Sequence, residues 1–195
     1  MFDLPNLMKP EPEPDKATLN RHYKAIFPQY DWKSHQDYLN LAKEACWWYD
    51  DLTTGKSKRW LSMLGQSGTG KTEWSKRLKA KLKADGKIVQ MWNWSDVCNN
   101  YLAKGDFAIL EHLKQLPILI IDEIGQRDWK TGTESLSNLL DSRLKKWTIC
   151  ISNFSQGEIA LRMDVRIASR MARNTSRIAF MSESCPDYHN KLKRA

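Results

Sequence analysis

One stretch of eight residues constrains the fold more than any other feature of the chain, because it matches the pattern G-x-x-x-x-G-K-[ST] at every defined position. The stretch reads Gly65, Gln66, Ser67, Gly68, Thr69, Gly70, Lys71, Thr72. Its glycines let consecutive backbone N–H groups curl around a polyphosphate, while the lysine adds positive charge and the last hydroxyl can ligate Mg²⁺. We therefore predict that this phosphate loop, residues 65–72, binds ATP together with Mg²⁺.

The residues on either side of the phosphate loop fit the context that the pattern requires, which is a strand before it and a helix after it. Residues 59–64 are typical of a short buried strand. Residues 73–84 are rich in helix formers with apolar side chains at helical spacing, and Asp85-Gly86 then ends the helix. This context disfavours the alternative, a glycine-rich turn that binds no ligand.

A second apolar run, residues 116–121, ends in the two carboxylates Asp122 and Glu123. A continuous run of this kind is typical of a strand buried on both faces of a parallel sheet. At its end Asp122 can help to hold Mg²⁺ opposite Thr72, and Glu123 can polarise a water for in-line attack on the γ-phosphate. Asn153 ends the next apolar run, where it can orient the same water or simply serve as a turn residue.

Strands alternate with helices along the chain, which predicts an α/β domain of three layers around a parallel sheet. The expected strands are residues 59–64, 87–92, 116–123, 147–153 and 178–181. The expected helices are residues 34–51, 73–84, 95–103, 107–114, 134–146, 156–161 and 165–172. Ligands of such sheets collect at the carboxyl ends of the strands, and the phosphate loop, both carboxylates and Asn153 all fall at such ends.

The composition fits a cytoplasmic protein with a polyanionic partner. Lys and Arg outnumber Asp and Glu by 31 to 23, although a merely soluble basic surface is the alternative. The four cysteines are far apart and form no C-x-x-C pair, which favours free thiols in a reducing compartment. No apolar run approaches the roughly 18 residues of a membrane span, so we expect no membrane partner.

Four segments resemble, in order and content, the AAA+ ATPases of the bacterial helicase-loader group, DnaC and DnaI, and the transposition ATPase IstB. They are GQSGTGKT, ILIIDEIG, SLSNLLDSRLKKWTICISNFS and DVRIASRM, within residues 31–181. The resemblance implies a P-loop NTPase fold with an AAA+ core over residues 31–183 and no C-terminal lid domain. Residues 1–30 are then a flexible tail containing a short helix, and residues 184–195 a basic tail.

The resemblance also assigns roles to three polar residues. Asn153 matches the sensor-1 position, and Arg170 matches the arginine finger that completes the nucleotide site of a neighbouring subunit. Arg166 would line the same interface. The resemblance thus implies a homo-oligomer, often a hexameric ring or an open spiral. From the residues alone, Arg166 and Arg170 are an i, i+4 pair on a solvated basic helix.

The function implied by the resemblance is that of a replicative helicase loader, which hydrolyses ATP and binds both a replicative DNA helicase and single-stranded DNA. The compact chain suits a phage or a mobile element. The alternatives are an IstB-like helper of a transposase, a small-molecule kinase, and a nucleotide-controlled binding module with negligible hydrolysis. Basic side chains follow a DNA backbone and aromatic rings stack on bases. The candidate DNA contacts are Lys104, Arg127, Trp129 and Lys130, followed by Trp92 and Trp94.

Overall fold

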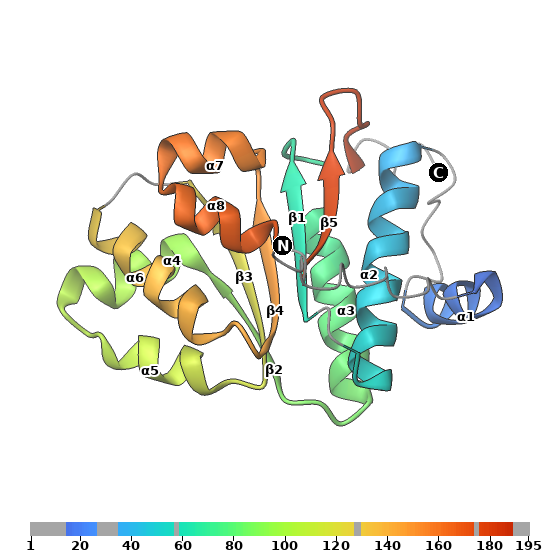
Figure 1. Ribbon diagram of the computed structural model, residues 1–195, viewed down its shortest axis with the longest axis horizontal. Helices are drawn as coiled ribbons and strands as arrows, with labels where there is room; N and C mark the ends of the chain where they lie inside the picture. The colour runs from blue at the N-terminus through green and yellow to red at the C-terminus, as the bar shows by residue number, and fades with distance from the viewer. Residues whose placement is uncertain (1–14, 27–34, 57–58, 127–129, 174–175, 189–195) are drawn as a thin grey trace, which may run out of the picture.

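The computed structural model describes residues 15–26, 35–56, 59–126, 130–173 and 176–188, which form a parallel sheet covered by helices on both faces (Figure 1). The strands are β1 (Trp60–Gly65), β2 (Val89–Asn93), β3 (Ile118–Ile124), β4 (Trp147–Ser152) and β5 (Ser176–Met181). They pair in the order β2-β3-β4-β1-β5, and every pairing is parallel. The predicted three-layer α/β architecture is confirmed.

Two layers of helices bury the two faces of the sheet. One layer holds α1 (Lys16–Ile26), α2 (Gln36–Thr54) and α3 (Lys71–Ala84), on the right in Figure 1. The other layer holds α4 (Trp94–Asn100), the short 3-10 helix η2 (Leu102–Lys104), α5 (Ala108–Gln115), α6 (Lys130–Ser142), α7 (Gln156–Arg162) and α8 (Val165–Met171). Successive side chains of a strand point to opposite faces, so Ile120 packs in the first layer and Ile121 in the second.

The helix predicted for residues 134–146 is displaced in the structure. Helix α6 begins at Lys130 and ends at Ser142, so Leu144 lies beyond the helix and is 38% exposed rather than on the apolar side. The chain turns away at Arg143, whose side chain is fully buried. Its guanidinium donates hydrogen bonds to main-chain carbonyls of residues 113, 116 and 147, and this contact determines where the helix ends.

The ends of the domain differ from the predicted boundaries. Helix α1 packs against the core through the buried Ile26, while residues 1–14 and 189–195 of the predicted tails lie outside the described residues. Residues 184–188 are not a tail, because Cys185 and Tyr188 are buried in the first layer of the core. The burial of their side chains beside Tyr38 on α2 extends the packed domain at least five residues past the expected end at 183.

All four cysteines are buried, and none of them forms a disulfide bond with a described residue. Within the described part of the chain, no helix combines the length and the apolar character that crossing a bilayer requires.

Candidate nucleotide-binding site

The phosphate loop connects the end of β1 to the first turn of α3. Gly65, Gly68 and Gly70 all adopt positive φ, at 98°, 76° and 85°. A Cβ added to Gly65 would lie 2.1 Å from the carbonyl oxygen of Met181 on the neighbouring strand, so this position excludes any side chain. The loop therefore has the backbone that cradles phosphate, and the N-terminus of α3 faces the same space.

The Lys71 side chain is folded into the phosphate loop. Its ammonium donates to the carbonyl oxygens of Gly65 at 2.7 Å and Gln66 at 2.6 Å. The side chain is almost completely buried, and this burial lowers the pKa of Lys71 to about 8. Both carbonyls belong to the loop itself, so a bound phosphate would exchange these acceptors for its own oxygens at little cost in hydrogen bonding.

The lowered pKa of Lys71 predicts how nucleotide affinity depends on pH. Below about pH 8 the ammonium is already charged, so this group leaves affinity unchanged. Above that pH the free protein loses the proton, which triphosphate binding must restore, so affinity for MgATP should fall by up to about tenfold per pH unit. Titration calorimetry in buffers of different ionisation enthalpy should detect proton uptake at about pH 9 and none at about pH 7. Constant affinity across this range would contradict the prediction.

Thr72 and Asp122 bring two oxygen ligands together where the loop meets β3. The Thr72 hydroxyl donates to Oδ2 of Asp122 at 2.8 Å, and Oδ1 of the same carboxylate accepts the backbone N–H of Glu123 at 2.8 Å. Burial raises the pKa of Asp122, because desolvation disfavours its ionised form. A hydroxyl beside a buried carboxylate is the kind of oxygen donor set that Mg²⁺ prefers, so these residues fit the predicted metal.

Glu123 has an unusual backbone conformation. Its φ is 58°, and it is the one residue other than glycine with positive φ among those described. The pairing of β3 with β4 shifts register between Ile121 and Ile124, which places Glu123 in a bulge. Such a conformation costs on the order of 1–3 kcal/mol and is found most often at functional sites. In a regular strand, successive side chains alternate between the two faces of the sheet. The bulge interrupts this alternation at Glu123, next to Asp122.

Hydrogen bonds around Ser152 connect the end of β4 to the ends of β3 and β1. Its hydroxyl donates to the carbonyl of Ile124 at 2.7 Å and accepts the N–H of Phe154 at 3.1 Å. The carbonyl of Phe154 in turn accepts the N–H of Gly65 at 3.2 Å. Asn153 lies half-buried between these residues, and its side chain makes no hydrogen bond to the described residues. The sequence analysis did not identify Ser152 as a site residue. The signal that could have indicated it is the polar pair Ser152-Asn153 at the end of an apolar strand.

The two arginines of α8 differ in how accessible they are. The Arg166 side chain is 61% exposed and forms an ion pair with Asp164 at 2.8 Å. The Arg170 side chain is 14% exposed and pairs with Asp141 on α6. Both guanidiniums are thus held by carboxylates of the second helical layer. Arg166 is the more accessible of the two, and Arg170 would have to leave Asp141 to reach a neighbouring subunit.

The predicted DNA contacts are only partly within the described residues. Lys104 at the end of η2 and Lys130 at the start of α6 are both exposed, whereas Arg127 and Trp129 lie outside the described residues. Trp94 is buried in the core and cannot stack on a base. Trp92 is half-buried, and its ring packs edge-on against Tyr101.

The segment 182–188 also contacts the phosphate loop, which no sequence motif indicated. The N–H of Tyr188 donates to the carbonyl of Gly68 at 2.8 Å. The Ser182 hydroxyl donates to Asp37 at the start of α2 at 2.6 Å, and the Tyr38 hydroxyl donates to a carbonyl of the same segment. This segment therefore links the loop to the beginning of α2.

The order of the strands, the phosphate loop after β1 and the carboxylates at the end of β3 define a P-loop NTPase fold. Within the part of the chain that the structure describes, no lid domain follows the core. No protein-family profile matches the sequence, and no curated protein matches it by sequence. The comparison with solved structures, in contrast, gives clear matches.

A crystal structure of DnaI aligns with a TM-score of 0.62 at 16% identity, covering 86% of this chain and 92% of DnaI. A DNA replication initiation factor aligns with a TM-score of 0.66 at 16% identity, covering 87% of this chain and 54% of that one. The replication initiator DnaA bound to AMPPCP and single-stranded DNA aligns with a TM-score of 0.64 at 16% identity, covering 87% and 56%. The chain thus spans about half of the latter two proteins, and the likeness establishes the fold.

Proposed function

We propose that this protein is a Mg²⁺-dependent ATPase. The observation that carries the proposal is the junction at the end of β3, where Asp122 bonds to Thr72 of the phosphate loop and Glu123 is held in a strained bulge beside it. The loop amides and Lys71 would bind the triphosphate, and Thr72 with Asp122 would hold the metal ion. Bound Mg²⁺ neutralises charge on the phosphoryl oxygens. Glu123 would accept a proton from the attacking water, which Asn153 orients.

Phosphate release from ATP tests this proposal directly. The purified protein should release phosphate in the presence of Mg²⁺ and stop when the metal is chelated. A fluorescent ATP analogue measures binding separately from turnover. Binding without turnover, even in the presence of DNA, would support a nucleotide-controlled binding module, and phosphate transfer to a small-molecule acceptor would support a kinase. Either result would overturn the ATPase proposal.

The proposed active unit is a homo-oligomer in which one subunit completes the site of the next. Arg170 would act as the finger in trans and Arg166 would line the interface, in a hexameric ring or a spiral. Both residues are on α8, and their ion pairs are with Asp164 and Asp141 rather than with a group of the phosphate loop. An arginine finger stabilises the charge that develops on the transferring phosphoryl group. This stabilisation raises the turnover rate by a factor on the order of 10³ to 10⁵.

Mixing two inactive variants should restore activity if the finger acts in trans. Glu123→Gln removes a group that acts within its own subunit, while Arg170→Ala removes a group offered to the neighbour. Each variant alone should be nearly inactive, but where an Arg170→Ala subunit meets a Glu123→Gln subunit the shared site is complete. Phosphate release from a titration of the two variants should therefore pass through a maximum. A flat, inactive titration would contradict the trans arrangement, and recovery with Arg166→Ala instead would assign the finger to Arg166.

The proposed biological role is replicative helicase loading with binding of single-stranded DNA through Lys104, Arg127, Trp129 and Lys130. The similar structures are named as DnaI, as a replication initiation factor and as a replication initiator bound to single-stranded DNA, which favours replication over transposition. Affinity capture with the ATP-bound protein should recover a replicative helicase. Recovery of a transposase instead would support the IstB-like alternative.

A further inference from the structure

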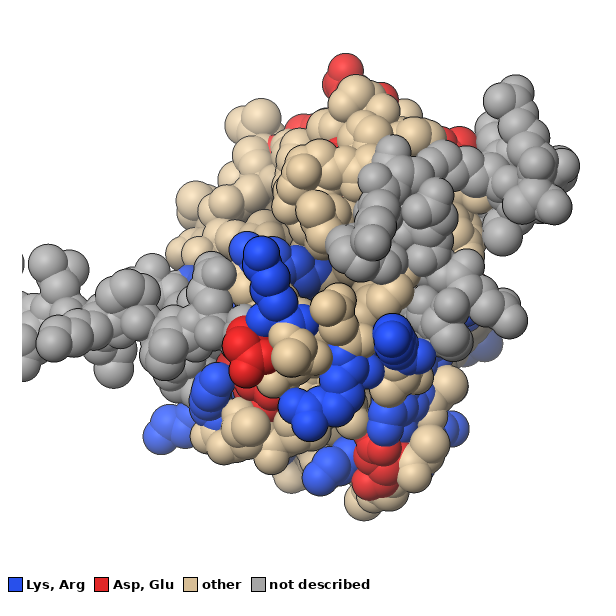
Figure 2. Space-filling view, turned by 90° about the vertical axis from the view of Figure 1, so that its right-hand side faces the viewer, with Lys and Arg blue, Asp and Glu red and all other residues tan. Residues whose placement is uncertain are grey.

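Lysine and arginine side chains gather on the face of the molecule where α1 lies, and few carboxylates interrupt them in the lower half of Figure 2. Helix α1 contains no acidic residue, and the one acidic residue of α3 is Glu73 in its first turn. We define the α1–α3 face by six cations of these two helices. They are Lys16, Arg21 and Lys24 on α1 and Lys76, Lys79 and Lys83 on α3, of which all but the half-buried Lys79 are exposed.

Side-chain contacts join the middle of α1 to the C-terminal end of α3. The ring of His22 packs edge-on against Tyr49 of α2, with centroids 5.0 Å apart. The Tyr49 hydroxyl donates to Asp85, which follows the last residue of α3. Lys81 of α3 pairs with the same carboxylate and lies over the Tyr49 ring, 5.5 Å from its centroid. These contacts place α1 beside the C-terminal end of α3.

Three carboxylates near this surface are paired with basic side chains, while Asp15 at the start of α1 accepts the backbone N–H of Thr18. Asp50 contacts His22 and Lys56, Asp85 pairs with Lys81, and Glu73 pairs with Arg77 at 3.2 Å. In contrast, none of the six cations of the α1–α3 face forms an ion pair with a described residue, and Arg21 donates only to the Thr18 hydroxyl, at 3.2 Å. The charge of this face is therefore available to an external anion.

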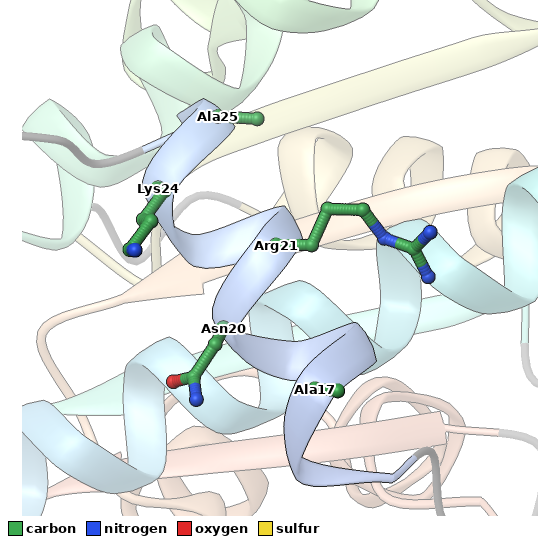
Figure 3. Close-up of a pocket in the computed structure, with 5 residues that line it drawn as sticks. All are labelled: Ala17, Asn20, Arg21, Lys24 and Ala25. Carbon is green, nitrogen blue, oxygen red and sulfur yellow. The ribbon is translucent and has the colours of Figure 1, made fainter.

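The outer side of α1 carries a shallow hollow with hydrogen-bond donors in its lining. It is lined by Ala17, Asn20, Arg21, Lys24 and Ala25 (Figure 3). The Asn20 amide and the Lys24 ammonium lie one turn apart and point to the same side of the helix, while Arg21 points the other way. Ala17 and Ala25 lie on the same side of the helix as Arg21. The amide and ammonium groups are hydrogen-bond donors that phosphate oxygens accept readily.

We propose that the α1–α3 face binds the phosphate backbone of a nucleic acid, separately from the contacts proposed at Lys104 and Lys130. A row of three lysines runs along α3, with a rise along the helix axis of about 4.5 Å from Lys76 to Lys79 and about 6 Å from Lys79 to Lys83. On α1 the rise from Asn20 to Lys24 is also about 6 Å. Such a row suits a polymer of regularly spaced negative charges. Tyr23 and Trp74 pack into the core, so the described part of this face offers no ring for base stacking.

The residue types favour nucleic acid over an acidic protein as the partner. Protein interfaces are enriched in aromatic residues and arginine and depleted in lysine, whereas five of the six cations here are lysines. A surface of lysines without stacking rings binds through the backbone and does not read the sequence. Binding should therefore be strongly dependent on salt and tolerant of base sequence.

The test measures the binding of a fluorescein-labelled oligothymidine of about twenty nucleotides by anisotropy, between about 50 and 200 mM salt. The triple variant Lys76→Gln, Lys79→Gln, Lys83→Gln removes half of the face. It should weaken binding at least about tenfold and reduce the magnitude of the salt slope by about 2, since each lost contact to a single strand contributes about 0.7. Adding Lys16→Gln, Arg21→Gln and Lys24→Gln should weaken binding further.

Three comparisons make the result specific. Replacing the same three lysines of α3 by arginine keeps the charge and should preserve affinity, while Lys145→Gln with Arg162→Gln removes exposed charge elsewhere and should change little. Unchanged binding by the six-residue variant would overturn the proposal. So would an equal loss with Lys145→Gln and Arg162→Gln, or equally tight binding of polyglutamate to the same face. Basal phosphate release should remain in every variant. If the wild-type protein released no phosphate, the ATPase proposal would be contradicted, but the proposal that the α1–α3 face binds nucleic acid would not.

Discussion

Replacing Glu123 by glutamine is expected to reduce ATP turnover by a factor on the order of 10² to 10⁴ while leaving ATP affinity nearly unchanged. The amide has the shape of the carboxylate but cannot accept a proton from the attacking water. Glutamine is also as tolerant as glutamate of the φ of 58° that the bulge imposes, so the strand end should keep its geometry. Phosphate release measures turnover, and a fluorescent ATP analogue measures affinity.

The matched control is Glu134→Gln, which makes the same chemical change at an exposed position on α6. This variant should hydrolyse ATP at the wild-type rate. Turnover by Glu123→Gln within about threefold of wild type would exclude Glu123 as the base, since general-base catalysis contributes far more than that. Loss of ATP binding along with turnover would indicate that the residue supports the bulge rather than the chemistry.

The fold and the phosphate loop could be predicted because their signals are local. The loop pattern specifies its own backbone through Gly65, Gly68 and Gly70, and apolar runs such as residues 116–121 identify strands buried on both faces. Once the sheet is parallel, topology places the strand ends together. The proximity of Thr72 and Asp122, 50 residues apart in sequence, follows from that rule without any further information.

The parts that could not be predicted depend on contacts between distant residues. The left-handed backbone of Glu123 results from the mismatch between β3 and β4, which no single segment encodes. The residues from 184 onward read as a basic tail, yet Cys185 and Tyr188 are buried in the core together with Tyr38 of α2. The accessibility of Arg166 and the pairing of Arg170 with Asp141 likewise depend on how α8 packs against α6.

Arg143 is the residue whose role the sequence conceals most completely. An arginine between Ser142 and Leu144 is typical of an exposed helix end, but here the side chain is fully buried. Its guanidinium donates to the carbonyls of Leu113, Leu116 and Trp147 at 2.8 Å each. Burial lowers its pKa to about 10, which still leaves the group charged at neutral pH. One side chain thus connects the loop before β3, the end of α6 and the start of β4.

Replacing Arg143 by methionine should therefore destabilise the domain by about 3–5 kcal/mol, because it leaves three buried carbonyls without donors. Urea unfolding followed by circular dichroism should show a lower midpoint at a similar slope. Arg143→Lys keeps the charge with fewer donors and should lose about half as much, which retains a measurable variant if the methionine protein does not fold. Lys145→Met at an exposed neighbouring position should change stability by less than about 0.5 kcal/mol. If Arg143→Met lowered the free energy of unfolding by less than about 1 kcal/mol, water would have to satisfy these carbonyls instead. The buried guanidinium would then contribute little to holding β3, α6 and β4 together.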